Sequence, residues 1–135
     1  MVTITTTYLG DLRCESTHGP SQTKLLTDAP LDNQGKGEAF SPTDLVATAL
    51  STCMLTVMGI AARHHGIALE GSSVMIEKSM VKSPTRRIGR LAVKISVPNP
   101  LTEAQQQLLT EAAMGCPVKT SLHADIDIPV EWDWA

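Results

Sequence analysis

One stretch of the chain, Ser41–His65, constrains the fold more than any other. Its central part, Leu45–Ala62, contains no charged residue. Ser41 can accept hydrogen bonds from the free N–H groups of a first helical turn, and Pro42 suits the first helical position. At the other end, Gly66 favours a stop. The pattern therefore predicts a long helix that is buried on nearly every side.

The uncharged run is also long enough to raise the possibility of a transmembrane helix. Against a transmembrane helix, the flanking segments are strand-like and show no excess of Lys and Arg on one side. Polar or flexible residues also interrupt the run, at Thr48, Ser51, Thr52, Thr56 and Gly59. We therefore expect the core helix of a soluble protein, with no membrane partner. A small domain has difficulty burying such a helix alone, so we expect a partner subunit to supply part of its cover.

The bulk properties narrow the class of protein. A chain of 135 residues is expected to form a single domain, 1–135, and an apolar fraction of 42% fits a globular protein. The net charge of −3, without a basic block, argues against nucleic acid as a partner. The start of the chain lacks the features of a signal peptide, and three widely spaced cysteines do not make a disulfide framework. We therefore expect a cytoplasmic protein.

Alternating apolar residues and turn signals predict the remaining elements. Strands are expected at 1–9, 12–17, 23–27, 73–81, 88–97 and 126–134, and helices at 102–114 and 117–122. The segment 28–40 is predicted to be a loop, and 73–81 and 88–97 a hairpin. This order predicts an α+β fold with antiparallel sheet and one dominant buried helix.

Two cysteines are candidates for chemistry, and the residues alone leave their roles open. Cys53 lies three turns inside the long helix, beyond the reach of the helix dipole, so it needs an external cation to ionise. Cys116 lies at the expected N-cap of a short helix, with Lys119 three residues on, and local electrostatics favour it as the thiolate. Either cysteine can equally be a small buried hydrophobe. Cys14, in a strand next to Arg13, is expected to be structural.

A metal site would have to combine Cys53 and Cys116 with some of His64, His65 and His123. The chain lacks Cys-x-x-Cys and His-x-x-x-His spacings, and adjacent histidines on a helix diverge by about 100°. We therefore predict no metal site. The two adjacent histidines are instead expected to interact with the C-terminus of the long helix.

Two motifs together resemble the OsmC/Ohr family (osmotically inducible protein C and organic hydroperoxide resistance protein), in its OsmC-like branch. The first is Phe40-Ser-Pro-Thr-Asp-Leu-Val-Ala-Thr-Ala-Leu-Ser-Thr-Cys53, and the second is Gly115-Cys116-Pro117-Val118. The resemblance extends over essentially the whole chain, including the leading strands, the hairpin and the last strand. It implies an OsmC-like fold, in which antiparallel sheets wrap long central helices in an intertwined homodimer.

The resemblance also implies an activity, that of a thiol-dependent peroxidase. Such an enzyme would reduce organic hydroperoxides and, more weakly, hydrogen peroxide. Cys53 would be the peroxidatic thiolate, which becomes a sulfenic acid, and Cys116 would be the resolving thiol that forms a disulfide with it. An external dithiol, lipoyl-linked in one branch of the family, would reopen the disulfide. No metal or bound cofactor is expected.

The external cation that Cys53 needs is, by resemblance, an arginine from the N-terminal region, and Arg13 lies there. In the peroxidases a glutamate directly after the proline orients that arginine. This chain has Thr43 at that position and Asp44 one residue later, so Asp44 is the candidate orienter. The departure motivates an alternative function, an OsmC-like protein without peroxidase activity that binds a small apolar ligand at the dimer interface.

Overall fold

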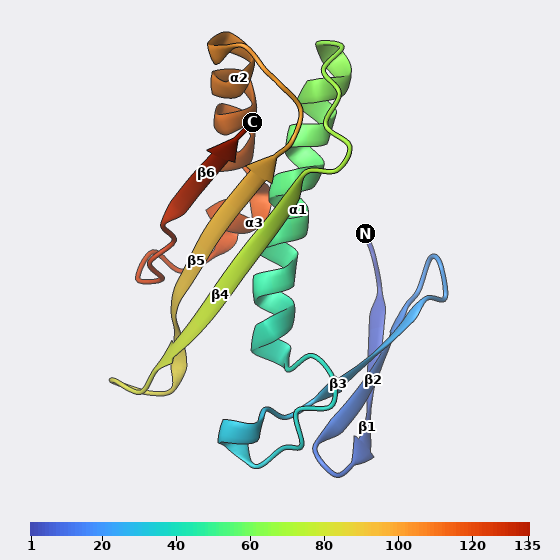
Figure 1. The fold of residues 1–135 in the computed structure, drawn as a ribbon. Helices are drawn as coiled ribbons and strands as arrows, with labels where there is room; N and C mark the ends of the chain where they lie inside the picture. Colours follow the sequence, from blue (N-terminus) through green and yellow to red (C-terminus); the bar gives the residue numbers. More distant parts are fainter. The chain divides into compact units, whose positions relative to one another are not determined.

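A computed structural model describes residues 1–135, which form two compact units (Figure 1). The first unit is Met1–Val46 and the second is Ala47–Ala135. The long helix α1 (Pro42–His64) begins in the first unit and continues into the second. The element types confirm the prediction of an α+β fold.

The first unit contains a three-stranded antiparallel sheet in the order β1-β2-β3. The strands are β1 (Ile4–Gly10), β2 (Arg13–His18) and β3 (Lys24–Asp28), which confirms the three predicted leading strands. A tight turn joins β1 to β2 at Asp11 and Leu12, both of which adopt positive φ angles. The register places Arg13, at the start of β2, opposite Asp28, at the end of β3.

This sheet contains no buried apolar side chain. All residues of β1 up to Leu9 are exposed, and the buried residues of the unit are Thr27, Asp28 and Ser41. Leu25 and Leu26 of β3 are 44% and 53% exposed. Because successive residues of a strand point to opposite faces, apolar side chains are uncovered on both faces of β3.

The predicted loop 28–40 is a closed segment with one 3₁₀ turn, Leu31–Asn33. Its two ends are joined, because the Asp28 N–H donates to the Phe40 carbonyl at 3.1 Å. Within it, the Gly37 N–H donates to Ala29 at 3.2 Å. A Cβ atom at Gly35 would lie 1.7 Å from the Ala29 carbonyl oxygen, so this position requires glycine.

Helix α1 begins and ends as its sequence predicts. The Ser41 hydroxyl accepts from the Asp44 N–H at 3.1 Å, and the Asp44 carboxylate accepts from the Ser41 N–H at 2.9 Å. This reciprocal pair caps the helix N-terminus. At the other end Gly66 has a φ of +63°, and the His65 side chain bonds the Ala61 carbonyl at 2.9 Å, which confirms the expected role of that histidine.

In the single chain α1 is buried along one face only, and the cover expected from a partner subunit stays a prediction. Its buried residues form one stripe at helical spacing: Ala47, Leu50, Met54, Met58 and Ala62. Other parts of the helix surface carry exposed residues, among them Ile60 at 54%. By length and composition α1 could cross a membrane, a test that the core helix of a soluble protein also passes.

The second unit contains a three-stranded sheet in the order β4-β5-β6. Strands β4 (Ser73–Val81) and β5 (Arg87–Val97) form the predicted antiparallel hairpin. Strand β5 supplies much of the core, because one face of it is almost fully buried: Leu91, Val93, Ile95 and Val97 are at most 3% exposed. Strand β6 (Val130–Trp134) carries two stacked indole rings, Trp132 and Trp134, with centroids 4.8 Å apart.

The last strand differs from the prediction in direction and in length. Strand β6 runs parallel to β5, as Figure 1 shows, so this sheet is mixed and not purely antiparallel. The reason is the connection, since α2 (Glu103–Met114) and α3 (Pro117–Ser121) lie between the two strands and act as a helical crossover. The strand also begins at Val130 and not at residue 126.

Helix α2 confirms its predicted start and end. Thr102 is the N-cap, and its hydroxyl accepts from the Gln105 N–H at 3.2 Å, while the Gln105 side chain accepts from the Thr102 N–H at 3.0 Å. Gly115 ends the helix, and its N–H donates to Glu111 and Ala112. Helix α3 starts two residues later, so Cys116 lies at the junction between the two helices.

Candidate active site: a thiol pair and an arginine cluster

Two of the three cysteines lie together inside the second unit. Cys53 is on α1, directly before Met54 of the buried stripe, and is half-buried. Cys53 raises the pKa of Cys116 through its side chain, so the two thiols are neighbours. Both are free thiols. The structure thus brings together the two cysteines that the sequence placed some sixty residues apart.

Cys116 is held in place by the start of α3. Its side chain is fully buried, and as the N-cap its sulfur accepts from the Lys119 N–H at 3.4 Å. The backbone N–H of Cys116 in turn donates to Ala113 at the end of α2, at 3.2 Å. Two helix ends therefore fix the position of this sulfur, which is a well-defined partner for Cys53.

The environment of Cys116 favours the thiol over the thiolate. Burial raises the pKa of Cys116, and the neighbouring Cys53 side chain raises it further. The backbone N–H groups of Lys119 and Val118 lower it, as expected at an N-cap, but the net shift is upward. The expectation that local electrostatics make Cys116 the thiolate is therefore wrong. Desolvation of a fully buried sulfur outweighs the start of a short helix.

Two neighbouring free thiols have a specific chemical capacity, because they can be oxidised together to a disulfide. Cys116 is the buried member of the pair, and burial favours its protonated form. Cys53 is also the more exposed of the two, as an attacking thiol must be.

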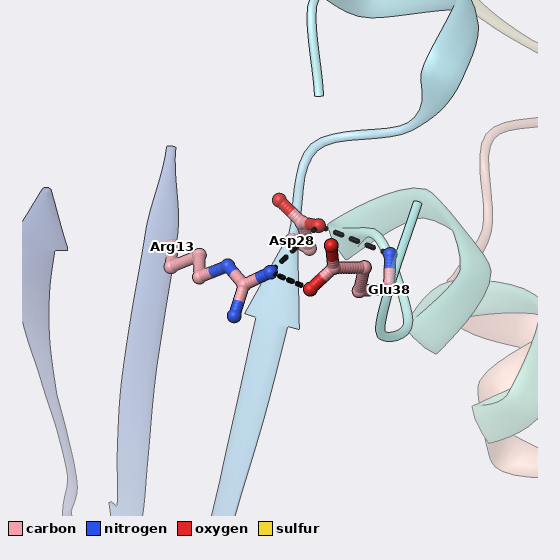
Figure 2. A network of polar contacts seen from close by, with 3 residues as sticks. All are labelled: Arg13, Asp28 and Glu38. Atoms are coloured by element: carbon pink, nitrogen blue, oxygen red, sulfur yellow. Dashed lines mark hydrogen bonds and ion pairs between the residues drawn. The ribbon is translucent and has the colours of Figure 1, made fainter. Parts of the chain in front are cut away.

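The first unit contains a cluster of three charged side chains, shown in Figure 2. Arg13 Nη2 contacts the Glu38 carboxylate and lies 3.7 Å from Asp28 Oδ2. The same Asp28 oxygen accepts from the Glu38 N–H at 3.0 Å. Arg13 comes from the start of β2, Asp28 from the end of β3, and Glu38 from the closed segment 28–40.

Asp28 and Glu38 are the carboxylates that the structure places against Arg13. The Asp44 carboxylate accepts from the Ser41 N–H, and its role as the orienter of Arg13 stays a prediction. Glu38, Asp28 and Asp11 all raise the pKa of Arg13, so its guanidinium stays charged. Arg13 belongs to the first unit and Cys53 to the second, and their pairing stays a prediction.

Asp28 and Glu38 were not predicted as site residues. Asp28 follows Thr27 directly at a strand end, where an acidic residue is ordinarily a turn former. Glu38 lies in a segment rich in glycine and charge, which is typical of an exposed loop. The sequence did contain a signal for this pair. In an antiparallel hairpin, an arginine that starts one strand can lie opposite an aspartate that ends the next strand. The register that pairs them is a tertiary property.

The remaining sequence candidates lie outside these two groups. Cys14 is half-buried in β2, opposite Tyr8 and Thr27. His123 is exposed and pairs with Asp125 at 3.7 Å. No group of three or more His, Cys, Asp or Glu side chains is arranged to hold a metal ion.

Comparison with known proteins assigns the chain to a family. The sequence profile described as OsmC, OsmC-like protein, matches residues 35–131. This range includes the whole of α1 and both cysteines of the thiol pair. No curated protein matches the sequence.

Solved structures show the same fold. A protein from Psychrobacter arcticus, assigned provisionally to osmotic stress induction and detoxification response, is 44% identical, with a TM-score of 0.92 over 98% of this chain and 96% of its own. An OsmC-like protein from Mycoplasma pneumoniae has a TM-score of 0.84 at 15% identity, over 100% of this chain and 97% of its own.

The organic hydroperoxide resistance protein OhrB of Bacillus subtilis has a TM-score of 0.73 at 18% identity, covering 98% of this chain and 97% of its own. At such low identity the likeness concerns the fold alone. The profile match over most of the chain, together with the 44% identical structure, carries the assignment. This chain belongs to the OsmC-like protein family.

Proposed function

We propose that this protein is a thiol-dependent peroxidase that reduces organic hydroperoxides and, more weakly, hydrogen peroxide. The observation that carries the proposal is that Cys53 and Cys116, two free thiols of one unit, are close enough for Cys53 to raise the pKa of Cys116. Family membership supports it, since several proteins of the same fold are named for organic hydroperoxide resistance.

The proposed reaction begins at Cys53. Its thiolate attacks one oxygen of the hydroperoxide, the O–O bond breaks, and the alcohol leaves after taking up a proton. Cys53 is thereby oxidised to a sulfenic acid. The two electrons that reduce the peroxide come from this sulfur.

The second step uses Cys116. Its sulfur attacks the Cys53 sulfenic sulfur, and the hydroxyl group leaves as water after taking up the Cys116 proton. The product is a Cys53–Cys116 disulfide. The raised pKa of Cys116 fits this order, because a resolving thiol that stays protonated does not compete for the peroxide. An external dithiol of the lipoyl type then reduces the disulfide by thiol–disulfide exchange, with no bound cofactor.

Arg13 is proposed as the cation that stabilises the Cys53 thiolate. A mid-helix cysteine gains little from its own helix dipole, and therefore needs a fixed positive charge. The raised pKa of Arg13 means that this charge is present at any working pH.

The proposed assembly is a homodimer. The first unit has no buried apolar side chain, and α1 buries only one stripe, so a second copy would cover apolar surface that a single chain exposes. Such a dimer matches the expected partner subunit for the long helix. No nucleic acid or membrane partner is proposed.

The experiment treats the fully reduced protein with one equivalent of cumene hydroperoxide and maps its thiols by mass spectrometry. We expect loss of two free thiols and one intramolecular Cys53–Cys116 disulfide. Cys53→Ser should abolish peroxide consumption, while Cys116→Ser should leave a trapped sulfenic acid at Cys53. Cys14→Ser is the matched control and should react like the unmodified chain.

Unchanged turnover in Cys53→Ser would contradict the proposal. So would thiols that are inert to peroxide in a protein that retains a small apolar molecule through purification. The latter result would support the alternative function, ligand binding at the dimer interface.

A further inference from the structure

The two neighbouring thiols of the second unit differ in their access to solvent. Cys116 is fully buried, at 0% exposure, whereas Cys53 is half-buried. A thiolate that opens a disulfide must reach one of its two sulfurs, so access helps to decide which sulfur is attacked. A disulfide between Cys53 and Cys116 would therefore present its two sulfurs unequally to an external reductant.

The burial of Cys116 is built into the fold of the second unit. Its backbone N–H donates to the Ala113 carbonyl at 3.2 Å, and its own carbonyl accepts from the Thr120 N–H at 3.1 Å. Leu109 and Ala113, on one face of α2, are also 0% exposed. A sulfur held in this way meets solvent only after a local opening of the structure, which costs free energy. We therefore expect Cys116 to stay buried when the disulfide forms.

The surroundings of Cys116 Sγ suit a sulfur that leaves when the disulfide is opened. The Lys119 N–H donates to it at 3.4 Å, and such a donor stabilises the negative charge that develops on a departing sulfur. Burial raises the pKa of Cys116, so the departed sulfur takes up a proton and does not attack in return. The raised pKa also slows its departure. Access outweighs this effect, because attack on the buried sulfur cannot begin without an opening.

We propose that the external dithiol attacks Cys53 Sγ and that Cys116 is the leaving group, so that reduction passes through a mixed disulfide on Cys53. This inference rests on the proposed function, which supplies both the Cys53–Cys116 disulfide and the dithiol. It assigns the buried thiol a second role, as the sulfur that is released first when the protein is reduced.

The reaction balances in two steps. One thiolate of the reductant forms a bond to Cys53 Sγ, the Cys53–Cys116 bond breaks, and Cys116 leaves with the electron pair and takes up a proton. The second thiolate of the reductant then attacks the reductant sulfur of the mixed disulfide, and Cys53 leaves as a thiolate. The reductant becomes an intramolecular disulfide and has given two electrons to the protein.

The test uses the full-length Cys14→Ser protein, in which Cys53 and Cys116 are the two remaining thiols. Diamide, which supplies no peroxide, first converts them to the disulfide. The probe is 2-mercaptoethanol, a monothiol that cannot complete the second step within one molecule and so leaves a mixed disulfide on the sulfur that it attacks. Acid stops the exchange, because the attacking species is a thiolate. Digestion with pepsin at low pH and mass spectrometry then locate the adduct.

We expect at least about tenfold more adduct on Cys53 than on Cys116, since the buried sulfur reacts only through local opening. The ratio is extrapolated to zero time, so that later transfer between the two sulfurs does not contribute. The matched control is the same disulfide form in concentrated urea, where burial is lost and both sulfurs should carry adduct. Adduct mainly on Cys116 in the folded protein would overturn the inference, and so would the same distribution with and without urea. Should Cys14→Ser not fold, the natural chain gives the same ratio, because each cysteine is read on its own peptide.

Failure of this inference can be told from failure of the proposed function, because diamide makes the disulfide without peroxide. If the adduct forms on Cys53 but the reduced protein does not consume cumene hydroperoxide, the peroxidase function fails and the direction of reduction stands. If the protein consumes cumene hydroperoxide but the adduct forms on Cys116, only the inference fails. If diamide leaves both thiols free in the folded protein, no disulfide joins them and both are overturned.

Discussion

The two sheets of this chain have the same number of strands but differ in what covers them. In the second unit, β5 alternates between exposed or half-buried and almost fully buried side chains, and Leu91 and Ile95 are 0% exposed. In the first unit β1 is exposed along nearly its whole length, and β3 leaves Leu25 and Leu26 uncovered on opposite faces. The second sheet holds a core of its own, whereas the first has no buried apolar side chain.

The largest effect is expected in the buried sheet. Leu91→Ala deletes a fully buried side chain from β5 and should lower the free energy of unfolding by about 2–5 kcal/mol. Urea unfolding followed by circular dichroism measures it. A loss below about 1 kcal/mol would contradict the view that β5 carries the core of the second unit.

A substitution in the exposed sheet should change the oligomeric state more than the free energy of unfolding. Leu26→Asp places a charge on the uncovered surface of β3 and should shift the proposed homodimer toward monomer, because a desolvated carboxylate opposes an apolar contact. Light scattering after gel filtration measures the mass. Gln22→Asp, in the turn between β2 and β3, is the control for charge and should leave the mass unchanged. A monomeric wild-type protein would contradict the proposal that a second copy covers the exposed apolar side chains of the β1-β2-β3 sheet.

A smaller effect concerns pH and the buried thiol of the second unit. The folded pKa of Cys116 is raised, so folding favours the protonated thiol. Its stabilisation is complete below the ordinary cysteine pKa of about 8.5 and is lost as the pH rises through the folded value. Under reducing conditions the unfolding free energy should therefore fall above about pH 8.5, by at most about 1.4 kcal/mol per pH unit from this group. Cys116→Ser should flatten that slope, and an equal slope in both proteins would contradict the assignment.

The smallest effect distinguishes two helix caps. Ser41 is 1% exposed where it caps α1, whereas Thr102 is exposed where it caps α2. Each substitution by alanine should cost about 0.5–2 kcal/mol of unfolding free energy, with Ser41→Ala the larger because it leaves a buried N–H unsatisfied. Chemical denaturation of both variants gives the difference. A larger loss in Thr102→Ala would reverse the expected order.

Local chemistry made most of the fold predictable. Caps, glycine stops and strand alternation gave α1, α2, the β4–β5 hairpin and the N-cap at Cys116, because these signals lie within a few residues of the structure they specify. The parallel direction of β6 was missed because direction depends on how a crossover packs. How much of α1 one chain covers could not be predicted, because burial is a property of the neighbours and not of the helix.

The candidate site was predictable to a similar extent. The thiol pair followed from two motifs, and the structure makes the two cysteines neighbours. The direction of the pKa shift of Cys116 was misjudged, because proximity to a helix start can be read from sequence and desolvation cannot. The partners of Arg13 were also missed, since Asp28 meets it only through strand register.

The sulfur that caps α3 would report the proposed disulfide through an amide proton. Helix α3 has five residues, and the Lys119 amide donates to Cys116 Sγ at its start. Joining that sulfur to Cys53 would replace a thiol acceptor by a disulfide sulfur and change the shielding of this amide proton. We expect the Lys119 cross-peak in an amide correlation spectrum to move on oxidation, while the Gln105 amide at the Thr102 cap of α2 stays in place.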